Sequence, residues 1–122
     1  MSQEPVYVQD VRALELPAVG PKPGATAGEP HESLLPLSDD GRVQTGIWEC
    51  TPGAFPSARD GYSELMLFLS GDATITDDDG TAHEIGPGTA LLLPDGWRGA
   101  WEIRGTVRKV YVITHPAGAS ET

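Results

Sequence analysis

Two stretches that each begin with glycine decide how this sequence folds: GAFPSARDGYSELMLFLSG at residues 53–71 and GTALLLPDGWRGAWEI at residues 88–103. Each consists of short apolar and aromatic runs, and turn residues such as Asp95-Gly96 separate these runs. Short runs punctuated in this way favour antiparallel strands over long helices. The two stretches therefore predict an all-β protein.

The same punctuation extends on both sides of these stretches, from about residue 42 to residue 114. Asp40-Gly41, Asp79-Gly80 and Gly105 are turn signals between further runs. The predicted strands are Val43–Cys50, Glu64–Leu69, Ala73–Thr76, Thr81–Ile85, Ala90–Leu93, Gly99–Arg104 and Val107–Thr114. Evenly spaced strands need a sandwich or a closed barrel to remove their edges, so we expect one small antiparallel barrel.

Residues 1–42 differ in composition from the rest, because proline and glycine recur throughout and exclude a continuous helix. We predict an extended N-terminal arm with short edge strands around residues 6–16 and 34–37, a barrel over residues 43–115 and a flexible tail over residues 116–122. The arm has too little apolar content to form its own core and is long enough to reach a neighbouring chain. We therefore expect a homodimer.

Composition excludes several classes of partner. The chain has 122 residues, with 8 Lys and Arg against 18 Asp and Glu, and its formal net charge is −10. Such a surface repels nucleic acid and anionic membranes. No apolar run is long enough to span a bilayer, and the N-terminal sequence lacks the basic start and apolar core of a signal peptide. We expect a cytoplasmic protein whose single cysteine, Cys50, is buried and reduced.

Glycine, glutamate and proline in the two stretches form a pattern that resembles the paired motifs of the cupin superfamily. Its members are listed here: Gly53, Glu64 and Gly71 in the first stretch, and Gly88, Pro94 and Gly96 in the second. The resemblance implies a small jelly-roll barrel with an internal cavity. The sequence of residues 46–53, 95–102 and 107–111 resembles that of a narrower group, the single-domain cupins grouped with the cupin-like half of (S)-ureidoglycine aminohydrolase.

The histidines of the family's metal cage are absent from this sequence. Counting from either anchor of the first motif, no alignment places a histidine between Gly53 and Glu64, and the second-motif position is Gly99. Only Glu64 of the usual three-histidine, one-glutamate set remains. One carboxylate does not hold a transition metal when three or four protein ligands are the norm. We expect no metal and no other cofactor.

Strand alternation indicates which side chains face the cavity. Trp101 points inward on the same face as Gly99, and the resemblance places Glu64, Met66 and Phe68 inside. A buried carboxylate needs a cation or hydrogen-bond donors. Lys109 and Tyr111 are the natural partners if their face of the last strand is inward, but Val110 and Val112 compete for that face. Glu64 is then either a buried ion pair that fixes the barrel or a functional group.

The sequence favours a metal-independent cupin that binds a small molecule. Its candidate catalytic residues are Glu64, Lys109 and Tyr111, and its candidate ligand-binding residues are Trp101, Met66, Arg59, Tyr62, Phe68 and Gly99. If the protein is an enzyme, a carboxylate beside lysine or tyrosine suits proton transfer, as in an isomerase, lyase or cyclase. Two alternatives remain open: a metal-dependent aminohydrolase or dioxygenase of the usual cupin kind, and a non-catalytic sensor or interaction domain.

Overall fold

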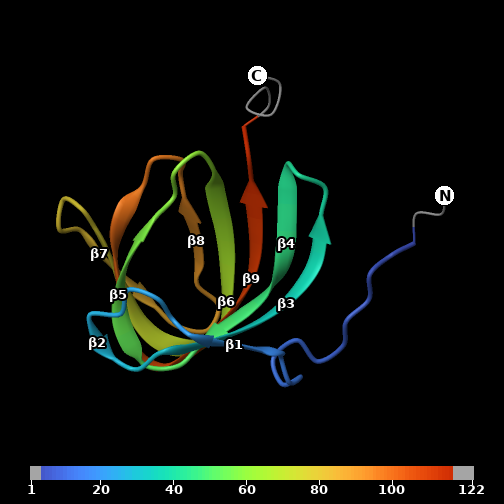
Figure 1. The fold of residues 1–122 in the computed structure, drawn as a ribbon, viewed down its shortest axis with the longest axis horizontal. Coiled ribbons are helices and arrows are strands. Elements are labelled where there is room, and N and C mark those ends of the chain that lie inside the picture. The colour runs from blue at the N-terminus through green and yellow to red at the C-terminus, as the bar shows by residue number, and fades with distance from the viewer. Residues whose placement is uncertain (1–3, 117–122) are drawn as a thin grey trace.

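A computed structural model describes residues 4–116, and within them the chain folds entirely into strands, turns and loops (Figure 1). The strands are β1 (Ala18–Pro21), β2 (Ala27–Gly28), β3 (His31–Asp39), β4 (Val43–Cys50), β5 (Gly53–Ala58), β6 (Ser63–Asp77), β7 (Ala82–Ile85), β8 (Ala90–Leu93) and β9 (Arg98–Thr114). All strand pairs are antiparallel. The predicted all-β barrel is therefore confirmed. Residues 4–116 contain no helix that is long and apolar enough to cross a membrane.

Two long strands, β6 and β9, connect the two halves of the barrel. The first half of β6 and the second half of β9 lie in one sheet with β8, β4 and β3, whereas their other halves pair with β7 and β5. Sequence analysis divided each of these strands in two. Register shifts between Phe68 and Ala73 mark the bend in β6, and Gly71 lies there with a φ of 117°. A Cβ at Gly71 would overlap Val107, so glycine allows the bend.

The segment before residue 42 joins the sheet by pairing β1 with β3 and β2 with β5. The edge strand expected around residues 6–16 does not form, because the amides of Ala13 and Leu14 both donate to the carbonyl of Asp10 and close a turn. The chain before this turn extends away from the barrel (Figure 1). Tyr7 in that stretch is 77% exposed. Of the tail expected over residues 116–122, residues 117–122 lie outside the described part.

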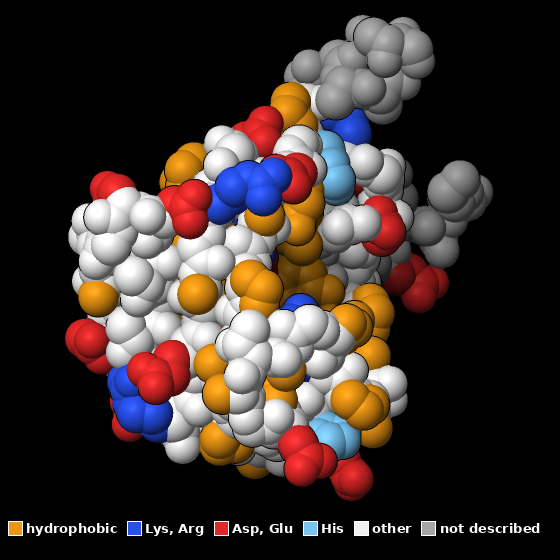
Figure 2. Space-filling view, turned by 60° about the vertical axis from the view of Figure 1, so that its left-hand side comes forward, with side chains coloured by type: hydrophobic (Ala, Val, Ile, Leu, Met, Phe, Trp, Pro, Cys, Tyr) orange, Lys and Arg blue, Asp and Glu red, His pale blue; other side chains and the backbone are white. Residues whose placement is uncertain are grey.

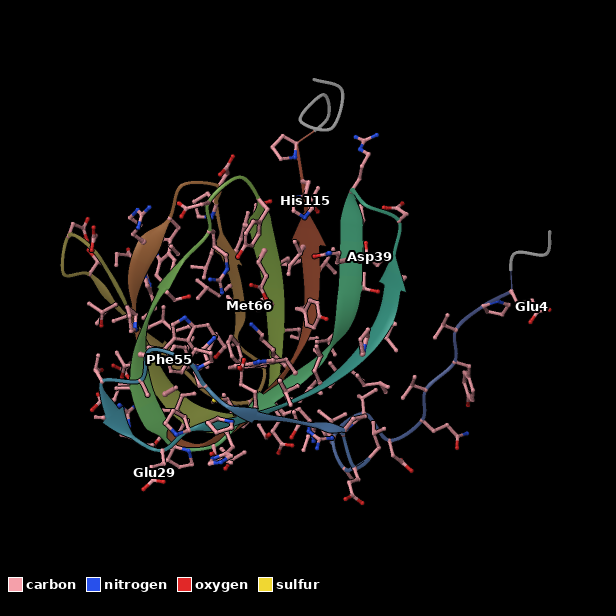
Figure 3. The ribbon with its side chains drawn as sticks, in the orientation of Figure 1. Glu4, Glu29, Asp39, Phe55, Met66 and His115 are labelled. Atoms are coloured by element: carbon pink, nitrogen blue, oxygen red, sulfur yellow. The ribbon has the colours of Figure 1, made fainter. Side chains whose placement is uncertain are left out.

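The barrel interior is apolar except at one place. The core contains Phe55, Met66, Phe68, Ile75, Trp101 and other buried residues from both halves of the barrel. In Figure 3 the labelled side chains of Phe55 and Met66 point into the barrel, while Asp39 and His115 lie at one rim. Cys50 is fully buried, and burial together with the charge of Glu32 raises the pKa of its thiol to about 11. The exception to the apolar interior is a cluster of charged side chains beside the core.

Candidate functional site

A cavity of about 260 Å³ opens on one side of the core. Its lining residues are Lys22, Leu34, Trp48, Phe55, Ser57, Arg59, Tyr62, Glu64, Trp101, Lys109, Tyr111 and Ile113. The space-filling view in Figure 2 shows a recess with hydrophobic side chains around it and cationic atoms visible inside. Aromatic and aliphatic walls with a few charged groups are typical of sites for small molecules.

Glu64 lies at the centre of the polar part of the cavity and is only 4% exposed. Its Oε1 accepts a hydrogen bond from Nε of Arg59 at 2.8 Å, and its Oε2 accepts one from Nζ of Lys109 at 2.8 Å. Both cations are themselves buried. The second half of β9 therefore turns Lys109 and Tyr111 into the barrel. Strand alternation alone did not decide whether these two residues or Val110 and Val112 face inward.

The ammonium group of Lys109 is enclosed on several sides. Besides Glu64, its Nζ lies 3.3 Å from Sδ of Met66. It also lies 4.5 Å from the ring centroid of Trp48 and 5.0 Å from that of Trp101. Indole faces attract cations, and this attraction grows where water is excluded. The cation is thus held by one carboxylate, one thioether and two aromatic rings.

Arg59 is fixed by the turn of the second motif. Its backbone amide donates to the carbonyl of Trp97 at 2.8 Å, and its carbonyl accepts from the amide of Gly96 at 2.6 Å. Its Nη1 donates to Oγ of Ser57 at 2.7 Å and to the carbonyl of Ala58 at 3.0 Å. The Asp95-Gly96 turn therefore reverses the chain and also positions the arginine that binds Glu64.

Burial and neighbouring charges shift the pKa values of Glu64 and Lys109 in opposite directions. Burial alone would raise the pKa of Glu64, but the charges and hydrogen bonds of Lys109 and Arg59 outweigh it and place that pKa below its ordinary value of 4.5. Burial lowers the pKa of Lys109, and Glu64 offsets only part of this effect. Glu64 is therefore an ionised and weakly basic carboxylate, whereas Lys109 releases a proton more readily than an exposed lysine.

Tyr111 lies next to this pair and stays protonated. Burial, followed by the negative charges of Glu64 and Asp39, raises the pKa of its phenol. Its ring rests against the backbone of β4 at Gly46, where an added Cβ would overlap the phenol oxygen. Glycine at this position leaves room for the tyrosine in the cavity wall.

The structure brings most of the predicted site residues together. Glu64, Lys109, Tyr111, Trp101, Arg59 and Tyr62 all line the cavity. Met66 and Phe68 are fully buried in the core and do not line it, although Met66 contacts Lys109. Gly99 does not line the cavity either, because a Cβ there would meet the carbonyl of Thr76 and the ring of Trp97.

Sequence reasoning missed half of the cavity wall, namely Lys22, Leu34, Trp48, Phe55, Ser57 and Ile113. Phe55 and Ser57 belong to β5, which Pro56 concealed, since proline usually breaks a central strand. Proline is tolerated here because β5 pairs fully with β9 alone and has only the two residues of β2 on its other side. Lys22 follows β1, and no local signal in the sequence places it near the barrel.

The metal site that a cupin resemblance implies does not fit the residues present. In residues 4–116 no group of three or more His, Cys, Asp or Glu side chains could hold a metal ion. The three histidines lie apart. His83 contacts Asp77, His31 contacts the carbonyl of Glu29, and His115 lies against Tyr62. The single carboxylate of the cavity is occupied by two cations.

Comparison with solved structures finds proteins that share this fold. A protein of unknown function from Pseudomonas syringae is 25% identical with a TM-score of 0.75, and the alignment covers 86% of this chain but only 46% of that one. The polyketide cyclase RemF from Streptomyces resistomycificus is 22% identical with a TM-score of 0.65, over 93% of this chain and 80% of that one. A predicted oxalate decarboxylase from Thermotoga maritima is 17% identical with a TM-score of 0.66, over 84% and 95%.

Sequence comparison assigns the family. None of the curated proteins matches this chain significantly. Residues 37–111, more than half of the chain, match the EutQ-like cupin domain. This match spans β4 to β8 and most of β9, including residues 53–71 and 88–103 and the Glu64–Lys109 pair. The chain belongs to the family of EutQ-like cupin domains.

Proposed function

We propose that this protein binds a small molecule in the barrel cavity without the help of a metal ion. The observation that carries the proposal is the state of Glu64, whose two oxygens each accept a 2.8 Å hydrogen bond from a buried cation. A metal ion at this carboxylate would have to displace Arg59 or Lys109, and the described residues that line the cavity offer no further carboxylate, imidazole or thiolate as a ligand. The ammonium of Lys109 supplies the positive charge instead.

The cavity wall supports a small and partly planar ligand. Trp101 stacks on Phe55 with a centroid separation of 5.8 Å and an interplanar angle of 20°. Trp48 meets Trp101 edge-on at 5.6 Å. Flat aromatic walls give apolar contact area to a flat ligand, while the charged groups on the other side fix its orientation. The volume of about 260 Å³ suits a metabolite rather than a large cofactor.

Proton transfer on the bound molecule is a second candidate function. The observation that favours it is the buried Lys109, whose lowered pKa eases proton exchange with a ligand in the same cavity. Cyclisation and decarboxylation are the activities named for two of the similar solved structures, and they belong to those proteins. The link to (S)-ureidoglycine aminohydrolase rests only on the sequence resemblance. A metal-dependent aminohydrolase or dioxygenase would need a donor set that residues 4–116 do not offer.

Ligand-observed NMR on chelator-treated protein tests the proposal. A library of small acids, amides, amines and neutral metabolites is screened against protein dialysed with EDTA. We expect compounds that bind the metal-free protein and lose binding in Leu34→Trp, which fills the cavity. Val19→Trp is the matched control, since Val19 is 60% exposed and does not line the cavity.

Two results would contradict the proposal. One is binding that appears only after Mn²⁺, Fe²⁺ or Zn²⁺ is added back. The other is binding that survives in Leu34→Trp, which would place the ligand elsewhere on the protein. Turnover of a bound compound, followed in the same tubes, decides between a binding protein and a proton-transfer enzyme.

A further inference from the structure

We propose that the ligand is a small organic carboxylate, and that Arg59 and Tyr111 bind its carboxylate group. This inference rests on the proposed function and adds the chemical class of the ligand. Three observations carry it: the charge of the cavity, two hydrogen-bond donors without partners, and the protonation state of Tyr111.

The cavity is cationic although the protein is strongly acidic. Lys22, Arg59 and Lys109 line it with positive charge, and Glu64 is the one acidic residue among the lining residues. Glu32 lies behind the wall, 3.5 Å from Lys22, and offsets part of the charge of that lysine. The chain as a whole carries a formal charge of −10. A cavity with excess positive charge on such a protein selects anions over neutral or cationic molecules.

Two donors in the cavity wall lack partners in residues 4–116. Arg59 uses Nε for Glu64 and Nη1 for Ser57 and Ala58, and its Nη2 makes no hydrogen bond. The hydroxyl of Tyr111 makes none either. Both side chains are more than nine-tenths buried, at 7% and 8% exposed, and both line the cavity.

These two donors remain reachable from the cavity. Among the described side chains, Trp101 Nε1 is the one buried polar atom that is both sealed from solvent and unpaired. Nη2 of Arg59 and the hydroxyl of Tyr111 are not sealed from solvent, so a ligand oxygen can approach them. A polar group that opens into a cavity is satisfied by water or by a ligand. A bound ligand with hydrogen-bond acceptors would supply a partner to both donors.

A carboxylate is the acceptor that fits these groups. Its two oxygens accept from a guanidinium N–H and a phenol O–H, and hydrogen bonds between ionised and polar groups are the strong ones. The raised pKa of Tyr111 keeps its hydroxyl protonated and therefore a donor. The rest of the ligand then lies against the aromatic wall of Trp101 and Phe55.

Matched pairs of acids and amides test this assignment. The probes are benzoate with benzamide, cinnamate with cinnamamide, and pyruvate with pyruvamide, titrated into ¹⁵N-labelled protein at pH 7. We expect the acids to bind at least about tenfold more tightly than the amides and to shift the amide signals of residues around the cavity. Tyr111→Phe should weaken the acids about tenfold and the amides less, since an ionised acceptor loses the stronger hydrogen bond. Tyr7→Phe is the matched control, because Tyr7 is exposed and does not line the cavity, and it should change neither series.

Each alternative outcome overturns a distinct claim. Amides that bind in the cavity as tightly as the acids, or acids that ignore Tyr111→Phe, would overturn the carboxylate assignment and leave metal-independent binding intact. Inorganic phosphate that competes with the acids more strongly than they compete with each other would replace carboxylate by phosphate as the ligand group. If neither series shifts the cavity signals at millimolar concentration, the carboxylate assignment fails, whereas the proposed function is decided by the wider library of amines and neutral metabolites.

Discussion

Nζ of Lys109 lies 2.8 Å from Oε2 of Glu64, although the two residues are 45 positions apart in the chain. The contact forms because β6 and β9 pair along their length and turn both side chains to the inside of the barrel. Each group alone would be an unpaired buried charge, which is expensive in an apolar interior. Their stability contributions are therefore coupled, and so are the predictions that concern them.

A double-mutant cycle measures this coupling. We expect Lys109→Met and Glu64→Gln each to lower the free energy of unfolding, by about 3–5 kcal/mol for a broken buried pair. Glu64→Gln should cost more, since it leaves both Arg59 and Lys109 without a carboxylate, whereas Lys109→Met leaves Arg59 on Glu64. The double variant should recover part of the loss, as measured by urea denaturation. Strictly additive losses would mean that the two side chains do not interact.

The lowered pKa of Glu64 predicts a specific sensitivity to acid. A carboxyl group with a folded-state pKa below its unfolded value contributes stability above the unfolded pKa and loses it as the pH falls through the folded one. The stability difference between wild type and Glu64→Gln should therefore be constant near neutral pH and shrink below about pH 4.5. Urea denaturation from pH 7 to pH 3 measures it. A difference that does not change over this range would contradict the lowered pKa.

Glycine at position 46 should be required for the cavity wall. An added Cβ would overlap the phenol of Tyr111 and the carbonyl of Leu35, so Gly46→Ala should displace the tyrosine and cost about 1–3 kcal/mol. Gly86→Ala is the matched control, because an added Cβ there meets nothing within 4 Å. Thermal unfolding of the two variants measures the difference. Equal stability would show that Tyr111 does not rest on β4.

An apolar outer face predicts association with a second copy of this chain. Leu65, Leu67 and Leu92 on β6 and β8 are 48%, 46% and 59% exposed, and Leu65 and Leu92 are paired across the strands. The arm already packs on the outer side of β9, where Arg108 donates to the carbonyls of Val11 and Leu14. The stretch before it, in which Tyr7 is exposed, extends away from the barrel, and we expect it to continue onto a neighbouring barrel.

Light scattering after gel filtration measures this association. We expect wild type at about twice 12.9 kDa at micromolar concentration. Leu65→Lys should shift the mass towards the monomer, because it places a charge in the apolar face. Ala82→Lys, at an exposed position at the start of β7, should leave the dimer unchanged. A wild-type protein that is monomeric at these concentrations would contradict the expectation.

The barrel could be predicted from the sequence because its signals are local. Asp-Gly turns and alternating apolar residues define strand positions such as β4, Val43–Cys50, and Gly71 marks the bend of β6. The inward direction of Glu64 was expected from the family likeness alone, because residues 65–69 are apolar on both faces of the strand. The division of β6 and β9 into shorter strands was wrong because bulges interrupt the alternation without ending the pairing.

The cavity could be predicted only in part, because its wall depends on long-range register. Trp48 faces Lys109 since β4 pairs with β9, and no pattern within either strand reveals that register. Gly99 has the parity of Trp101, but the ring of Trp97 fills the space beside it. Lys22 reaches the cavity only because β1 pairs with β3. These positions follow from the folded barrel rather than from local sequence.

The metal content of the purified protein tests the central claim most directly. The protein is produced in medium supplemented with Mn, Fe, Ni and Zn, desalted without a chelator, and measured by elemental mass spectrometry against its concentration. With Arg59 and Lys109 on both oxygens of Glu64, we predict far less than one transition-metal ion per chain. About one ion per chain, retained through desalting by wild type and lost in Glu64→Gln, would contradict the account.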